Sequence, residues 1–215
     1  MNRAVIFDLD GTLADTLEDI AGAVNRALGA HGLAVHSLDD YCKMIGDGFL
    51  TLVQRALPAD LCTVDLVAEV RAKAADDYAS HCLDRTSSYP GVPGLLEALA
   101  GRGVPMAVLS NKPHELTLLV VRGLFPNTPF TIIRGELDAF PRKPDPTSAL
   151  DIAKRLGMAP RDVLYLGDSN VDMETARGAG MVALGAGWGF RGEAELLASG
   201  AKAVLATPGE LLDYL

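Results

Sequence analysis

Two aspartates near the N-terminus, Asp8 and Asp10, have the type and spacing for nucleophilic and acid–base chemistry. They follow a short apolar run and lie two residues apart, so in extended backbone both side chains would point to one face. Neighbouring carboxylates repel each other, so one could attack as a nucleophile while the other works as acid and base. Gly11 would allow the sharp turn that presents them. Taken alone, the pattern fits an exposed Asp-Gly turn equally well.

A second acidic pair, Asp168 and Asp172, follows another apolar run. Carboxylates four residues apart across a strand-to-helix turn can converge on one hard cation, and magnesium also accepts phosphate oxygens. The alternative is helix capping by Asp168 or Ser169. Capping alone does not explain why a second strand brings an acid to the sheet edge expected for Asp8. The sequence therefore predicts a Mg²⁺ site at this edge.

Two further segments could hold a phosphoryl group. Ser110-Asn111-Lys112 offers a hydroxyl and backbone N–H groups to anionic oxygens, although capping of a helix that begins near His114 is the simpler interpretation of this segment alone. Lys143 lies between Pro141 and Pro144, which restrict the backbone and could aim the lysine at the site. A solvated lysine on a stiff loop is the alternative.

Other patterns carry less weight. The stretch from Gly187 to Gly192 fits a dinucleotide-binding pattern, but it lies too near the C-terminus to open the required βαβ unit, and we expect a glycine-rich loop beside the site. The cysteines Cys42, Cys62 and Cys82 lack C-x-x-C spacing. We expect them to be reduced thiols with buried structural roles.

The elements that would position these residues alternate between short apolar runs and segments of helix length. This alternation predicts βαβ units and a parallel sheet, which binds ligands at the carboxyl ends of its strands. The predicted strands are Ala4–Phe7, Pro105–Leu109, Phe130–Ile133, Val163–Leu166 and Val182–Leu184. We expect an α/β fold whose core is a Rossmann-like, doubly wound parallel sheet.

One stretch, residues 16–82, interrupts this alternation and shows no strand pattern. Its predicted helices are Leu17–Ala30, Leu38–Met44, Phe49–Leu57 and Leu66–Ser80. We expect a small α-helical cap domain over residues 16–82, with the catalytic core in residues 1–15 and 83–215. Hinges near Asp15–Thr16 and Cys82–Ser88 would let the cap close over the site.

Bulk composition restricts the possible partners. The 215 residues suit one domain with an insertion, and the hydrophobic content of 49% argues against disorder. A net charge of −9 without a basic stripe argues against nucleic acid and anionic membranes. No apolar signal segment is evident, so we expect a cytoplasmic protein that acts on a small molecule. A monomer is the expected state, with a dimer as the alternative.

Together the motifs resemble the haloacid dehalogenase superfamily of phosphohydrolases and occur in that family's order. The four motifs are Asp8–Thr12, Ser110–Lys112, Lys143–Pro144 and Gly167–Asp172. The helical insert matches the cap of one subgroup. Tyr89–Gly94 and the Trp188-Gly189 turn are similar to the branch of phosphoglycolate phosphatase-like proteins.

The resemblance implies a mechanism in which Asp8 attacks phosphorus and forms an aspartyl-phosphate. Asp10 would protonate the leaving alkoxide and then activate the hydrolytic water. Mg²⁺ would be held by Asp8, the carbonyl oxygen of Asp10 and Asp168, with Asp172 bound directly or through water. The implied phosphoryl-binding and substrate-binding residues are Thr12, Ser110, Asn111, Lys143 and, in the cap, Gly46, Asp47 and Gly48.

Other chemistries of the family fit less well. Dehalogenases and phosphonate-cleaving members replace the second acid of the first motif, so Asp10 disfavours both, although Lys43 lies in the cap. Phosphomutases of the family use an arginine in the substrate-binding loop of the cap, and the corresponding loop here, Ile45–Phe49, has none.

The substrate expected first from the branch resemblance is 2-phosphoglycolate. Sugar phosphates, nucleoside monophosphates and pyrophosphate stay open. A receiver domain, which keeps one phosphate instead of turning over many, is a different class that shares a doubly wound sheet, clustered aspartates and a Lys-Pro pair. Receivers are much shorter and lack a helical insert.

Overall fold

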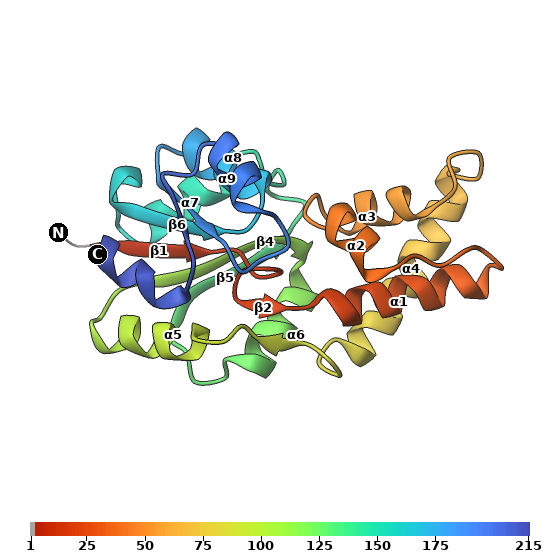
Figure 1. Ribbon diagram of the computed structural model, residues 1–215, viewed down its shortest axis with the longest axis horizontal. Helices are drawn as coiled ribbons and strands as arrows, with labels where there is room; N and C mark the ends of the chain where they lie inside the picture. The colour runs from red at the N-terminus through yellow and green to blue at the C-terminus, as the bar shows by residue number, and fades with distance from the viewer. Residues whose placement is uncertain (1–2) are drawn as a thin grey trace.

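The computed structural model describes residues 3–215, so residues 1–2 of the expected core lie outside the described part. Within residues 3–215, six parallel strands form one sheet in the order β5-β4-β1-β6-β7-β8 (Figure 1). The strands are β1 Ala4–Phe7, β4 Met106–Pro113, β5 Phe130–Glu136, β6 Val163–Gly167, β7 Val182–Ala186 and β8 Ala203–Leu205. β1 lies between β4 and β6, where the strand order reverses. The predicted doubly wound sheet is confirmed, and β8 is a strand that the sequence analysis did not predict.

Helices cover both faces of the sheet, as the alternating pattern requires. The helices of the sheet layers are α5 Val92–Gly101, α6 His114–Leu124, α7 Thr147–Arg155, α8 Asn170–Gly178 and α9 Glu193–Ala198. β1 is buried throughout, and its side chains alternate between two apolar clusters. Val5 and Phe7 pack in the cluster that includes residues of α5 and α6, whereas Ile6 packs in the cluster with residues of α7, α8 and α9. This double burial fixes the end of β1 in the middle of the molecule.

The stretch between β1 and α5 is helical, as predicted, and extends beyond the edge of the sheet layers (Figure 1). Its helices are α1 Leu17–Ala30, α2 Leu38–Met44, α3 Phe49–Ala56 and α4 Val64–His81. The connections to the core contain two short strands, β2 Ala14–Asp15 and β3 Ser87–Ser88, which pair antiparallel and which the sequence analysis did not predict. They lie at the two expected hinges.

Strand β4 is longer than predicted and carries the Ser110-Asn111-Lys112 segment within it. Its pairing with β5 is irregular: Leu109 pairs with Arg134, but Pro113 pairs with Glu136, so β4 bulges between these points. Bulges next to active sites redirect side chains. The prediction that the strand ends at Leu109, with the segment in the turn that follows, was wrong for this reason. Helix α6 begins at His114, and no side chain caps it.

The cysteines are free, but only Cys82 is buried; Cys42 is half-buried and Cys62 is exposed. Burial was therefore wrongly predicted for Cys62, which lies in the connection between α3 and α4. Among residues 3–215, no helix is both long enough and apolar enough to cross a membrane.

Candidate active site

The carboxyl ends of β1, β4 and β6 face a cavity of about 560 Å³ that helices from residues 17–56 close on the other side. Core residues that line it include Asp8, Asp10, Ser110, Asn111, Lys112, Lys143, Asp168, Ser169, Phe190 and Arg191. The opposite wall consists of Ile20, Ile45, Gly46, Gly48, Phe49 and Leu52. The four motifs, which are spread over residues 8–172 of the chain, thus meet at one edge of the sheet.

Three buried carboxylates converge at this edge. Asp8, Asp168 and Asp172 each offer one oxygen, and these oxygens lie within 4.8 Å of one another. Burial and the neighbouring carboxylates of Asp8 and Asp172 raise the pKa of Asp168 well above its ordinary value. Burial and Asp172 likewise raise the pKa of Asp8, against the opposing effect of Lys143. The protein therefore concentrates negative charge where a cation would relieve it.

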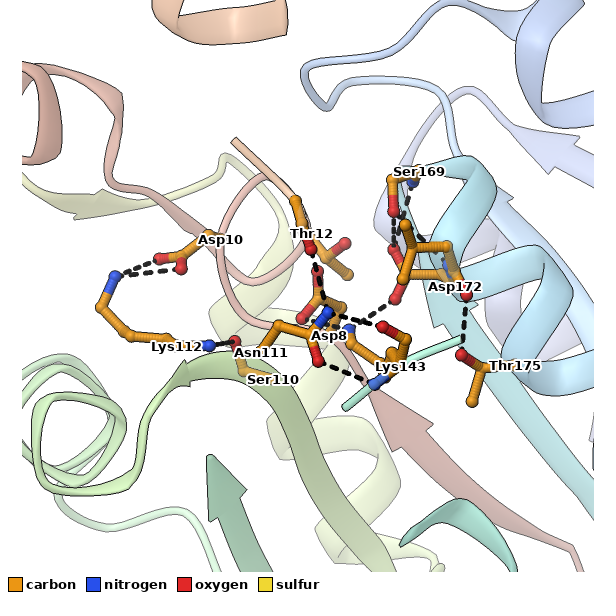
Figure 2. A network of polar contacts seen from close by, with 12 residues as sticks. Asp8, Asp10, Thr12, Ser110, Asn111, Lys112, Lys143, Ser169, Asp172 and Thr175 are labelled. Atoms are coloured by element: carbon orange, nitrogen blue, oxygen red, sulfur yellow. Dashed lines mark hydrogen bonds and ion pairs between the residues drawn. The ribbon is translucent and has the colours of Figure 1, made fainter. Parts of the chain in front are cut away.

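Lys143 is the cation nearest to these carboxylates (Figure 2). Its Nζ lies 2.6 Å from Asp172 Oδ1 and 2.9 Å from Asp8 Oδ1, and the side chain is almost fully buried. Burial alone would lower the lysine's pKa, but Asp172 and Asp8 outweigh it and raise the pKa above the ordinary value. Lys143 is therefore a charged ammonium, aimed at the site as predicted.

Asp172 is held on two sides. One oxygen contacts Lys143, and the other accepts hydrogen bonds from the hydroxyl and backbone N–H of Ser169. Ser169 also accepts from the Asp172 backbone N–H, which completes a capping box at the start of α8. Both interpretations of this segment are thus present together: Ser169 caps the helix, and the cap positions an acid of the carboxylate cluster.

The loop after β1 approaches Asp168 closely. Gly11 has φ +85°, and a Cβ there would stand 2.2 Å from Asp168 Oδ2, so both the backbone and the space require glycine. The Thr12 hydroxyl lies 3.4 Å from Asp168 Oδ1, and Trp188 Nε1 donates to the Thr12 carbonyl at 2.9 Å. Phe190 N–H donates to Asp168 Oδ2 at 2.8 Å. The glycine-rich loop lies beside the site, as expected.

Asp10 is held by a lysine to which the sequence analysis gave no role. Lys112 Nζ lies 2.8 and 2.9 Å from the two Asp10 oxygens (Figure 2). The Thr16 hydroxyl donates to Asp10 Oδ1 at 2.7 Å. The same ammonium lies 4.5 Å from the ring centroid of Tyr78 on α4. The signal in the sequence was that Lys112 directly follows Ser110 and Asn111, two residues predicted to bind the phosphoryl group. The partner, 102 positions away, could not be inferred from spacing.

The remaining predicted residues are Ser110 and Asn111 in β4 and Gly46, Asp47 and Gly48 in the helical stretch. Ser110 lines the cavity, and its hydroxyl oxygen accepts from Lys112 N–H at 3.2 Å. Gly46 and Gly48 also line it. The Asp47 carboxylate instead pairs with Arg55 at 2.6 Å, and Asp47 is not among the lining residues. The Asn111 side chain bonds to backbone atoms of Lys143 and Gly46, which uses both of its amide hydrogens.

The carboxylate cluster fits a divalent metal ion. Asp8 Oδ1 is buried and has no hydrogen-bond partner among the described residues, although Lys143 makes an ion-pair contact with it. Oxygen donors, a net excess of buried negative charge and raised carboxyl pKa values suit a hard cation such as Mg²⁺. Asp8, Asp168 and Asp172 would each offer it one oxygen, and the Asp172 oxygens are also contacted by Lys143 and Ser169.

Comparisons with known proteins agree on one family. The model of the haloacid dehalogenase-like hydrolases matches residues 5–186. A phosphoglycolate phosphatase from Aquifex aeolicus is 33% identical over 87% of this chain and 86% of its own. One from Rhodospirillum rubrum is 34% identical over 100% of this chain and 91% of its own. The crystal structure of a predicted phosphoglycolate phosphatase from Haemophilus somnus superposes with a TM-score of 0.92 at 26% identity, covering 99% and 97% of the two chains.

Proposed function

Because the chain belongs to the haloacid dehalogenase-like hydrolases, we propose that it is a magnesium-dependent phosphatase that hydrolyses a small phosphate monoester through an aspartyl-phosphate on Asp8. The observation that carries this proposal is the Asp8 carboxylate, buried at the base of a cavity beside Lys143 and Asp168. A desolvated carboxylate with a cation beside it, which favours its ionised form, is suited to attack a phosphoryl group.

The chemical steps follow from the residues at the cavity. An Asp8 oxygen attacks phosphorus, the bond to the ester oxygen breaks, and Asp10, which must enter this step in its protonated form, gives its proton to the leaving alkoxide. Asp10 then takes a proton from a water that attacks the phosphorus, which breaks the bond to Asp8 and releases phosphate. Lys112 and Thr16 hold Asp10 in place for both proton transfers.

The phosphoryl group carries negative charge throughout, and Lys143 neutralises part of it. Its oxygens would be contacted by Thr12, in the loop after β1, and by Ser110 and the segment around Asn111, within β4. Mg²⁺ would be held by Asp8, Asp168 and the carbonyl oxygen of Asp10, with Asp172 bound to it directly or through water. The ion would supply the remaining positive charge and orient the phosphate.

Residues 16–82 would act as a cap domain hinged at β2 and β3, with the core in residues 1–15 and 83–215. The first candidate substrate is 2-phosphoglycolate, since the relatives from A. aeolicus and R. rubrum are called phosphoglycolate phosphatases. The Gly46–Gly48 loop would contact the part of the substrate beyond the phosphate.

Phosphate release from a panel of monoesters, with and without Mg²⁺, tests this proposal. The panel contains 2-phosphoglycolate, sugar phosphates, nucleoside monophosphates and pyrophosphate. We expect EDTA to abolish turnover and Asp8→Asn to lower kcat by at least about a thousandfold, because the nucleophile is lost. Wild-type turnover by Asp8→Asn would refute the assignment of the nucleophile. A single phosphate retained per protein would indicate a receiver instead.

A further inference from the structure

The side chain of Asn111 holds the backbone of Lys143 from both sides. Its Oδ1 accepts from Lys143 N–H at 2.9 Å, and its Nδ2 donates to the Lys143 carbonyl at 3.0 Å. Asn111 is buried, so these bonds are shielded from water. At the other end of Lys143, the ammonium is fixed between Asp8 and Asp172. Asn111 therefore holds the backbone of the residue whose buried ammonium contacts the carboxylate cluster.

The second amide hydrogen of Asn111 goes to the opposite wall of the cavity. Nδ2 also donates to the Gly46 carbonyl at 3.1 Å. Gly46 belongs to residues 43–48, which we call the cap loop: the last two residues of α2 and the connection from α2 to α3. One carboxamide thus bonds to the cap loop and to Lys143 at the same time, so its three hydrogen bonds complete only when both are in place.

Two arginines of the core also bind the cap loop: Arg191, which lies far from Lys143 in the chain, and Arg142, the residue directly before Lys143. Arg191 Nη2 donates to the carbonyls of Lys43 and Ile45 at 3.1 and 3.3 Å. Arg142 Nη1 donates to the Asp47 carbonyl at 3.4 Å. The cap loop therefore presents backbone acceptors to the core along its length. Its Gly46 bond reaches Lys143 through the Asn111 carboxamide, its Asp47 bond reaches the residue before Lys143, and its two Arg191 bonds lead elsewhere.

We propose that Asn111 is a positioning residue that couples seating of the cap loop to the placement of Lys143. The proposal rests on the proposed function and adds a role that the phosphate-binding assignment of Asn111 does not include. When the cap loop withdraws, the buried amide loses an acceptor, and the clamp on Lys143 weakens. Coupling of two sites is reciprocal, so a phosphoryl group that holds Lys143 must also favour the seated loop.

Hydrogen exchange of the cap-loop amides, measured with Mg²⁺ and with or without inorganic phosphate, tests this coupling without turnover. In the wild type we expect phosphate to slow exchange of residues 43–48 by about tenfold, a typical coupling. In Asn111→Ala the slowing should vanish. Arg191→Gln should raise the exchange rate with and without phosphate but keep their ratio, because Asn111 still links the loop to Lys143.

Steady-state kinetics add a second readout. Asn111→Ala should lower kcat by roughly tenfold because Lys143 is misplaced in the transition state, whereas Arg191→Gln should mainly raise KM. Asn127→Ala makes the same change at an exposed site and should alter neither measurement. If Asn111→Ala does not fold, Asn111→Asp keeps the acceptor for Lys143 N–H, lacks both donors, and should show the same loss of slowing.

The outcomes separate the two proposals. Phosphate-dependent slowing that persists in Asn111→Ala or Asn111→Asp, or that is absent from the wild type, overturns the coupling. If slowing occurs and depends on Asn111 but no monoester is hydrolysed, the proposed function fails and the coupling stands. If monoesters are hydrolysed without slowing, only the coupling fails.

Discussion

At the scale of single residues, the ion pair between Lys112 and Asp10 shows how the site fixes a proton-transferring acid. Both side chains are largely buried, and the lysine's pKa is raised, since the attraction of Asp10 and Tyr78 outweighs burial. The ammonium contacts both Asp10 oxygens. Because Tyr78 lies on α4, one lysine contacts both Asp10 and a helix of the stretch between β1 and α5.

Removal of this lysine should cost both stability and rate. Lys112→Met leaves Asp10 without its cation in a largely buried position, and we expect a loss of about 3 kcal/mol in the free energy of unfolding. A fall in kcat should accompany it, because Asp10 is no longer held. Urea unfolding and phosphate-release kinetics measure the two effects. Lys73→Met, the same change at an exposed position of α4, should alter neither the free energy of unfolding nor kcat. Equal effects of the two substitutions would contradict the role of Lys112.

The residues that could be predicted from the sequence are those that belong to a recognisable motif. Asp8, Asp168 and Lys143 lie together because parallel strands deliver their carboxyl ends to one edge, which the alternating pattern predicts. The ion pair of Lys112 with Asp10 and the hydrogen bond from Asn111 to the Gly46 carbonyl could not be predicted. Those contacts depend on side-chain directions at a bulge and on the position of the cap loop, and neither follows from local pattern.

At the scale of elements, two helices begin with the same capping box but differ in what the box holds. In α2, Ser37 and Asp40 satisfy each other's backbone N–H groups at an exposed site. In α8, Ser169 and Asp172 do so in the buried carboxylate cluster, where Asp172 also binds Lys143. The sequence offers two matched tests of capping, one inside the site and one outside.

Ser169→Ala and Ser37→Ala should therefore have similar effects on stability and different effects on activity. Each removes one cap, which costs about 1 kcal/mol. Only Ser169→Ala should also lower kcat/KM, because Asp172 loses a partner that keeps it beside Lys143. Thermal unfolding and steady-state kinetics of both variants provide the comparison. Unchanged kcat/KM in Ser169→Ala would mean that Lys143 alone positions Asp172.

Helix boundaries followed closely from the sequence, whereas short strands did not. Leu17–Ala30 and Leu38–Met44 were predicted to the residue, since their apolar spacing and acidic first turns are local signals. β2 and β3 have two residues each, too few for any alternation to be visible. Their pairing depends on contact across the whole helical insert.

At the scale of the whole molecule, the site is an acidic centre in an acidic protein of net charge −9. Asp168 is buried beside like charges, so its pKa in the folded state is raised above the unfolded value. The folded protein then binds the proton more tightly than the unfolded chain does. The stabilisation is present at low pH and is lost as pH rises from the ordinary carboxyl pKa through the raised one.

Asp168→Asn should consequently stabilise the metal-free protein at pH 7. The amide stays neutral and can still accept from Phe190 N–H, so we expect Tm in EDTA to rise by about 2–4 °C, the shift that 1 kcal/mol gives in a chain of this size. The gain should shrink toward pH 4, where the wild type is itself protonated. Mg²⁺ should raise the Tm of the wild type and not that of the variant.

Asp145→Asn is the control of opposite sign. Hydrogen bonds from Thr147 lower the pKa of this exposed carboxyl, so its charged form is favoured in the folded state. Its neutralisation should give no gain in Tm at pH 7. A lower Tm for Asp168→Asn than for the wild type, at pH 7 in EDTA, would contradict the electrostatic strain assigned to the carboxylate cluster.

The central position of β1 has a consequence for how the molecule is made. Both sheet neighbours of β1 come much later in the chain, since Val5 pairs with Met106 and Leu164. At about 5–20 residues per second, a delay of roughly 10–30 s separates synthesis of β1 from that of its second neighbour. Through this time an apolar strand has no partner, while the contacts among helices α1–α4 can already form. Asp8 is thus translated well before Lys143 and Asp168 and must wait for them before its site is complete.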